Sequence, residues 1–93
     1  MIKTKKEYGF VAKALPAADI QKLLFRIGRT LKTARQKRTT LDRFSYEINI
    51  SRTQMGKYES GHNMLLSTFL KVLHGLDIST EEFFRELEKS GKQ

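Results

Sequence analysis

Apolar residues recur every three or four positions along most of the chain, and this spacing predicts a helical protein. The clearest apolar stripe runs through Ile20, Leu23, Leu24, Ile27, Leu31 and Ala34. Because proline suits the first turn of a helix, we expect this helix to begin at Pro16 and to end near Lys37. Its opposite face carries Lys22, Arg26, Arg29 and Lys32. Strand-like alternation is confined to Tyr8–Val11.

A short helix is expected next, with Thr40 as its N-cap. It runs to about Ile48, buries Phe44 and Ile48, and carries Asp42 in its first turn, where a negative charge suits the helix dipole. Asn49 ends it, because asparagine tolerates the left-handed backbone conformation.

A second short helix begins almost at once. Ser51 and Gln54 have the spacing of a capping box, in which each side chain bonds the other residue's backbone N–H. The helix is expected to run to Ser60 and to stop at Gly61. Only two residues separate it from the preceding helix, so the pair must cross steeply, as in a helix-turn-helix.

Two more helices complete the chain. One covers about 66–74, with Asn63 or Ser67 as its cap, and is expected to bury Leu66, Phe69, Leu70 and Leu73. The other opens with the capping box Ser79–Glu82 and continues through Leu87. The prediction is an all-α, five-helix orthogonal bundle over residues 16–89, with a basic N-terminal arm at 1–15 and a frayed tail at 90–93.

The charge of the chain is unevenly placed. The net charge is +8, and the whole excess lies in the first forty residues. Such a field attracts polyanions, either nucleic acid or an anionic membrane surface, although basic helix faces are also common on soluble proteins. Cysteine is absent, which excludes disulfides and thiolate metal sites. With no long apolar segment and no cysteine, we expect a cytoplasmic protein without a membrane partner.

The close helix pair carries a family resemblance. The residues are Arg35, then 40–45 with the sequence Thr-Leu-Asp-Arg-Phe-Ser, then the block 51–61 that contains Ser51, Tyr58, Glu59 and Gly61. Together with the apolar residues at 69–76, residues 20–87 resemble the lambda-repressor/Cro-like helix-turn-helix (XRE) family. The chain departs from the family pattern at Leu41, where a glutamine is usual, and at Gly56, inside the second helix of the pair.

The resemblance implies a DNA-binding transcriptional regulator. It assigns base contacts to Arg52, Thr53 and Lys57, and DNA-backbone contacts to Ser51, Thr40, Arg43 and Ser60. It also assigns a structural ion pair to Arg35 and Glu59. Without the resemblance, Arg52 and Lys57 could instead be ordinary solvated surface residues. Thr53 is equally well explained as an exposed helix residue. The Gln54 side chain is expected to serve the cap.

An enzyme is not expected. His62, Asn63 and His74 superficially resemble a nuclease motif, but the further metal ligands that such chemistry needs are not visible in the sequence. No cofactor, metal or small-molecule ligand is expected. The expected partner is double-stranded DNA, bound by a homodimer that reads a palindrome and represses transcription in the nucleoid. Its interface would be the last helix or the Tyr8–Val11 segment. The rival is an antitoxin or a protein-interaction modulator on the same fold.

Overall fold

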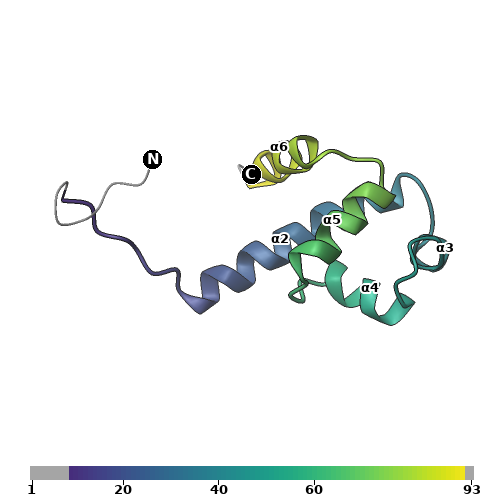
Figure 1. Cartoon of the computed structure of the whole chain (residues 1–93), viewed down its shortest axis with the longest axis horizontal. Coiled ribbons are helices and arrows are strands. Elements are labelled where there is room, and N and C mark those ends of the chain that lie inside the picture. Colours follow the sequence, from purple (N-terminus) through teal and green to yellow (C-terminus); the bar gives the residue numbers. More distant parts are fainter. Residues whose placement is uncertain (1–8, 92–93) are drawn as a thin grey trace.

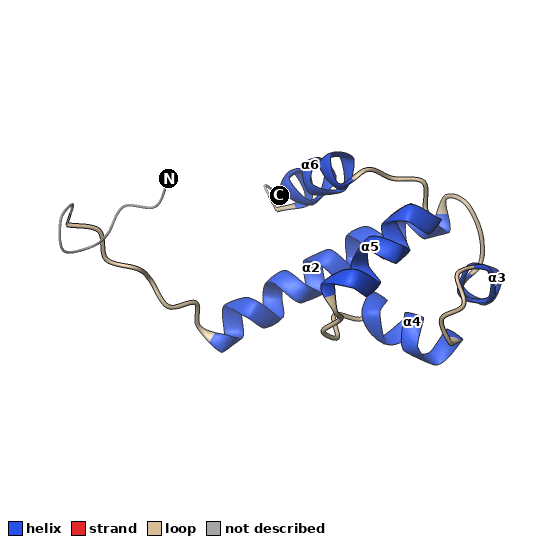
Figure 2. Cartoon of the chain, viewed as in Figure 1, coloured by secondary structure: helices blue, strands red, loops and turns tan. Residues whose placement is uncertain are grey.

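The computed structural model describes residues 9–91, and their regular structure is entirely helical (Figures 1 and 2). The helices are α2 (Ala17–Gln36), α3 (Leu41–Glu47), α4 (Arg52–Glu59), α5 (Leu66–Gly75) and α6 (Thr80–Ser90). The predicted all-α class and the five helices are confirmed for this part of the chain. Gly9–Val11 form no strand, and the rest of the basic segment at 1–8 lies outside the described residues.

Helix α2 is the longest helix, and three of the other helices pack against it. Pro16 is its N-cap rather than its first residue, and the Pro16 carbonyl accepts hydrogen bonds from the backbone N–H of Asp19 and Ile20. Helices α3, α4 and α6 all contact α2. In Figure 1 these helices gather around its C-terminal part, while its N-terminal turns extend beyond them.

The apolar stripe of α2 is therefore buried over only part of its length. Leu31 is fully buried, whereas Ile20 and Leu23, which lie on the same apolar stripe, are exposed. The reason is length: a 20-residue helix spans about 30 Å, and the shorter helices packed on it do not reach its first turns.

Helices α3 and α4 are joined by the tight turn that the sequence predicted. Asn49 has φ = 60°, and the N–H of Ile50 donates to the carbonyl of Ser45. These are the features of a helix C-terminus closed by a left-handed residue. In Figure 1, α3 is seen nearly end-on while α4 lies across the view, so the two helices cross steeply.

Helix α5 is rotated relative to its predicted orientation. Phe69 and Leu73 are buried as expected, together with Val72, but Leu66 is 72% exposed and Leu70 is also exposed. The apolar residues of α5 span an arc of about 160°, which is wider than the face that the core covers, so Leu66 and Leu70 at one edge of the arc stay exposed. The N-cap is Leu65, without a side-chain cap bond, and neither Asn63 nor Ser67 has this position.

Helix α6 begins with the predicted capping box. The Ser79 hydroxyl accepts from the N–H of Glu82, and the Glu82 carboxylate accepts from the N–H of Ser79. Phe83 is buried and Phe84 is 47% exposed. The helix extends to Ser90, one residue into the segment expected to fray.

One core joins all five helices. Its buried members are Leu31, Phe44, Met55, Phe69, Val72, Leu73, Leu76, Phe83 and Leu87. Phe69 and Phe83 meet edge to face across α5 and α6, with 5.1 Å between their ring centroids. This core holds α3 and α4 at one end of the molecule, where the sequence places its candidate functional residues.

Candidate nucleic-acid interface

The position of α4 is fixed by a buried ion pair. Arg35 Nε donates to Glu59 Oε2 at 2.9 Å and Arg35 Nη2 donates to Glu59 Oε1 at 2.8 Å, so the predicted pairing is present as a two-point contact. Both side chains are more than nine-tenths buried. The hydrogen bonds to Glu59 raise the pKa of Arg35 above its ordinary value, and the charge of Glu59 adds to this effect while burial opposes it. Arg35 therefore stays charged, and a buried pair of this kind is costly to break.

A close backbone contact sets the distance between α2 and α4. A Cβ atom at Gly28 would lie 2.6 Å from the carbonyl oxygen of Tyr58 and 2.7 Å from that of Glu59. Only a residue without a Cβ fits there. The end of α4 is thus held by Gly28 and by Arg35, two turns apart on the same side of α2.

The start of α4 is capped by a side chain. Ser51 Oγ accepts from the N–H of Gln54 at 3.0 Å. The expected return bond from the Gln54 side chain is absent between these two described residues, so only half of the capping box forms. Ser51 has an extended backbone that lets its oxygen reach back to the helix, and the half-buried Gln54 side chain is not needed for the cap.

The exposed face of α4 carries three of the predicted residues. Thr53, Lys57 and Ser60 are exposed and follow one another at helical spacing, on the side opposite the buried Met55. Ser60 Oγ donates to the carbonyl of Gly56 at 3.0 Å, so its hydroxyl proton is engaged within the helix. A cation and two hydroxyl groups thus form one solvent-facing polar stripe.

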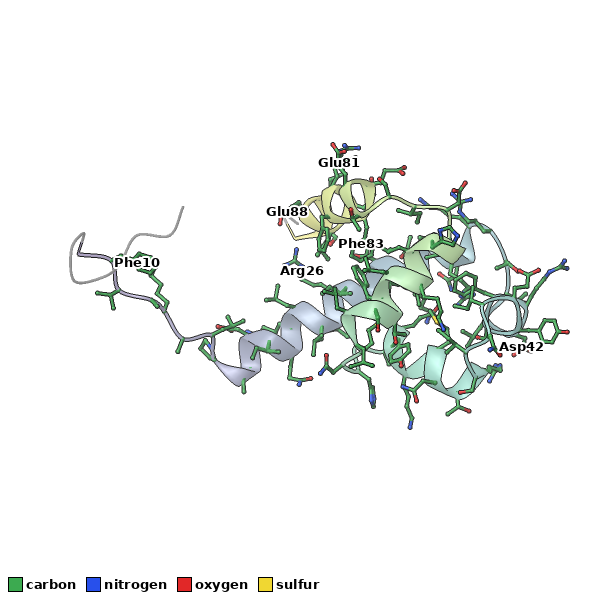
Figure 3. The ribbon with its side chains drawn as sticks, viewed as in Figure 1. Phe10, Arg26, Asp42, Glu81, Phe83 and Glu88 are labelled. Carbon is green, nitrogen blue, oxygen red and sulfur yellow. The ribbon has the colours of Figure 1, made fainter. Side chains whose placement is uncertain are left out.

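Arg52 is the first residue of α4, about 100° around the helix from Thr53, and its side chain is held toward α3. Its Nε forms an ion pair with Asp42 Oδ1, and both side chains are mostly exposed. Figure 3 labels Asp42 at the edge of the molecule where α3 and α4 meet. The sequence had assigned Asp42 only to the helix dipole. A guanidinium beside a carboxylate must exchange that partner before it can contact a base or a phosphate.

The predicted backbone-contacting residues of α3 are also exposed. Thr40 Oγ1 accepts from the N–H of Arg43 at 3.2 Å, as a cap should, and Arg43 pairs with Glu47 at 3.3 Å one turn further along the helix. Leu41, the departure from the family pattern, is half-buried and packs against the core. It offers no polar contact at this surface.

One exposed residue beside these was missed by the sequence reasoning. Tyr46 is 87% exposed and lines a shallow hollow between α3 and the start of α4, together with Asn49, Ser51 and Arg52. The signal was present, because Tyr46 falls between the apolar positions Phe44 and Ile48 of its helix. A phenol hydroxyl at this place adds a hydrogen-bonding group to the α3–α4 surface.

Over residues 9–91, fold and site together define a helical bundle whose short polar helix α4 is exposed on one side and fixed by a buried ion pair on the other. No family model matches the chain, and no curated protein or solved structure matches it. In the part of the chain that the structure describes, no helix is long and apolar enough to cross a membrane.

Proposed function

We propose that the chain binds double-stranded DNA sequence-specifically, with α3 and α4 as a lambda-repressor-like helix-turn-helix and α4 as the recognition helix. The observation that carries this proposal is the exposed stripe of Thr53, Lys57 and Ser60 on a helix whose other face is anchored by Arg35 and Glu59. Anchoring on one side and polar exposure on the other are what a helix entering the major groove requires.

The proposed roles follow from the chemistry of each group. Arg52 and Lys57 donate to guanine O6 and N7, and Thr53 contacts a base edge or a thymine methyl group. Ser51, Thr40, Arg43 and Ser60 contact phosphates, and the N–H groups at the start of α4 favour a negative charge. The net charge of +8 supports this proposal through its attraction for the DNA backbone.

The biological role that fits best is transcriptional regulation by a homodimer on a palindromic operator. A single recognition helix covers only a few base pairs, so two copies related by a two-fold axis supply the remaining specificity. The half-exposed Phe84 on α6 is the apolar residue that supports the last helix as the interface.

A protein-interaction role on the same fold is the second candidate. The exposed side chains of Leu66 and Leu70 favour it, because they lie one turn apart on α5. An antitoxin would combine both roles, binding DNA and a partner protein.

The test is selection of bound duplexes from a random-sequence pool by the full chain, followed by titration of the selected duplex and a base-shuffled control. We expect a short symmetric site to be enriched and bound at least about tenfold more tightly than the shuffled duplex at physiological salt. Failure to enrich any sequence, with equal weak binding to both duplexes, would overturn the proposal.

A further inference from the structure

A basic groove runs between α2 and α6. Its volume is about 580 Å³, and it is lined by Arg26 and Arg29 of α2 and by Lys37 and Arg38 of the turn that follows α2. The apolar part of its lining includes Phe25, which is 50% exposed, and the buried Phe83. None of the roles proposed for the α3–α4 surface uses these residues.

The groove lies on the side of α2 away from α4. Gly28 and Arg35 face α4, whereas Arg26 contacts α6. At about 100° per residue, Arg26 and Lys37 project about 160° and 180° from Gly28 around the α2 axis, whereas Arg29 and Phe25, at about 100° and 60°, form the edge of the groove. Figure 1 likewise has α6 and α4 on opposite sides of α2. A ligand in the groove would therefore not compete with a duplex held by α4.

The positive charge of the groove is not neutralised from within. Among the described residues, none of Arg26, Arg29, Lys37 and Arg38 forms an ion pair with a carboxylate. Arg26 Nη2 donates instead to the carbonyl of Leu87 at 2.9 Å, and Arg26 Nε is buried without a partner. Figure 3 labels Arg26 on α2, beneath α6.

The carboxylates of the α6 wall are already engaged. Glu82 accepts the backbone N–H of Ser79 in the capping box, and Glu86 pairs with Lys89 at 3.3 Å. Arg85, which also lines the groove, pairs with Glu81 at the helix surface. The unpaired charge of the groove is therefore that of the cations on α2 and on the turn that follows it.

Phe25 and Arg29 combine an apolar and a cationic surface at the groove edge. The Arg29 guanidinium lies over the Phe25 ring, 5.8 Å from its centroid. Such a pair suits a ligand that brings an apolar side chain and a carboxylate one helical turn apart. A duplex is convex and carries its phosphates on the outside, so it does not reach an apolar floor between two helices.

From this charge complementarity we propose that the α2–α6 groove is a docking site for an acidic, amphipathic helical segment of a partner protein. Its carboxylates pair with Arg29, Lys37 and Arg38, and its apolar side chain packs on Phe25. The protein would then carry two independent binding surfaces, so that the groove recruits a partner while α4 is occupied. The proposal does not depend on DNA binding by α4.

The test uses a fluorescein-labelled helical peptide as long as α6, with glutamates along one face and leucines along the other. We expect it to bind the full chain, and the double variant Arg29→Glu/Lys37→Glu to weaken binding by about tenfold or more. The matched control is Lys22→Glu/Lys32→Glu, which makes the same charge change at two exposed α2 positions outside the groove. This control should lose only a small part of the affinity.

Two further measurements separate loss of the peptide site from loss of folding. Thermal melts of both double variants establish that they fold, and Phe25→Ala should weaken the peptide without altering duplex binding. Absence of peptide binding to the wild-type chain, or equal losses in the two double variants, would overturn the proposal. Preferential binding of a single-stranded oligonucleotide with the same sensitivity to Arg29 and Lys37 would also overturn it, because the groove would then serve nucleic acid.

Discussion

The ion pair between Asp42 and Arg52 sits on the surface that the proposed function turns toward DNA. Both side chains are largely exposed, and an exposed pair contributes about 1 kcal/mol or less to folding stability. Its importance is therefore in binding: a carboxylate at this place repels phosphates and competes with the DNA for the Arg52 guanidinium.

Asp42→Asn tests this competition. The variant should bind both selected and shuffled duplexes several-fold more tightly, because it removes a negative charge and releases Arg52, and its melting temperature should stay close to that of the wild type. Fluorescence anisotropy at fixed salt measures the affinities. Glu81→Gln on α6 is the matched control, because it removes the same charge from an exposed ion pair, that with Arg85, away from the α3–α4 surface. Unchanged or weaker binding by Asp42→Asn would show that Asp42 instead positions Arg52 for its contact.

Residue type predicted the N-cap residues of three helices, but it did not predict the hydrogen-bond partner of Arg26. Thr40, Ser51 and Ser79 all accept the backbone N–H bonds expected from their types and positions. Arg26 was assigned to a solvated face, yet it donates to the carbonyl of Leu87, 61 residues away. Local spacing carries no information on a partner so distant in sequence.

At the scale of elements, replacing a glycine by alanine should have opposite effects on stability at two helical positions. A Cβ at Gly56 would meet only Leu41 Cδ2 at 3.8 Å, which is ordinary van der Waals contact, whereas a Cβ at Gly28 would overlap the α4 backbone. Gly56→Ala should stabilise the protein by about 1 kcal/mol through helix propensity. Gly28→Ala should destabilise it by about 1–3 kcal/mol, because α2 and α4 must move apart. Urea denaturation of both variants measures the difference, and two shifts of the same sign would contradict this account of the α2–α4 contact.

The ion pair that anchors α4 gives a second prediction at this scale. Glu59→Ala leaves Arg35 buried without its carboxylate and should reduce the free energy of unfolding by about 3–5 kcal/mol. Glu47→Ala, which removes a carboxylate from an exposed pair, should change it by less than about 1 kcal/mol. Chemical denaturation followed by circular dichroism compares the two variants. Equal small effects would show that the Arg35–Glu59 pair does not hold α4 in place.

The helix boundaries were accessible from the sequence, but the buried faces were only partly so. Asn49 and Gly61 end α3 and α4 with positive φ, as their residue types predicted. In α5 the apolar residues form an arc wider than the buried face, and Phe69, which packs on Phe83 of α6, is buried while Leu66 is exposed. The apolar stripe on α2 likewise did not show how much of the helix is covered, because the stripe continues past the point where the helices packed on α2 end.

For the whole molecule, the proposed function requires two copies on one operator. Sedimentation velocity with and without the selected duplex should detect two chains per duplex, with half-sites about 34 Å apart along the DNA. Phe84→Ala should weaken this cooperative binding if α6 forms the interface, and a thermal melt controls for its contacts with Phe69 and Phe83. One chain bound to a single half-site without cooperativity would contradict the dimer.

The two surfaces of the molecule differ in what the sequence could reveal about them. Residues 41–61, which form the α3–α4 surface, are contiguous in sequence, so motif spacing alone assembles their candidate contacts. The α2–α6 groove joins residues that are far apart in the chain, such as Phe25 and Phe83, and only the fold brings them together.

Sequence-specific recognition by α4 is the central claim, and Arg52→Ala tests it most directly. The affinities of wild type and variant are compared on the selected duplex and on its shuffled control at one salt concentration. We predict a loss of about 1–3 kcal/mol on the selected duplex, a much smaller loss on the shuffled one, and relaxed preference at one base position. Equal losses on the two duplexes would contradict a reading role for Arg52 and reduce its contribution to charge alone.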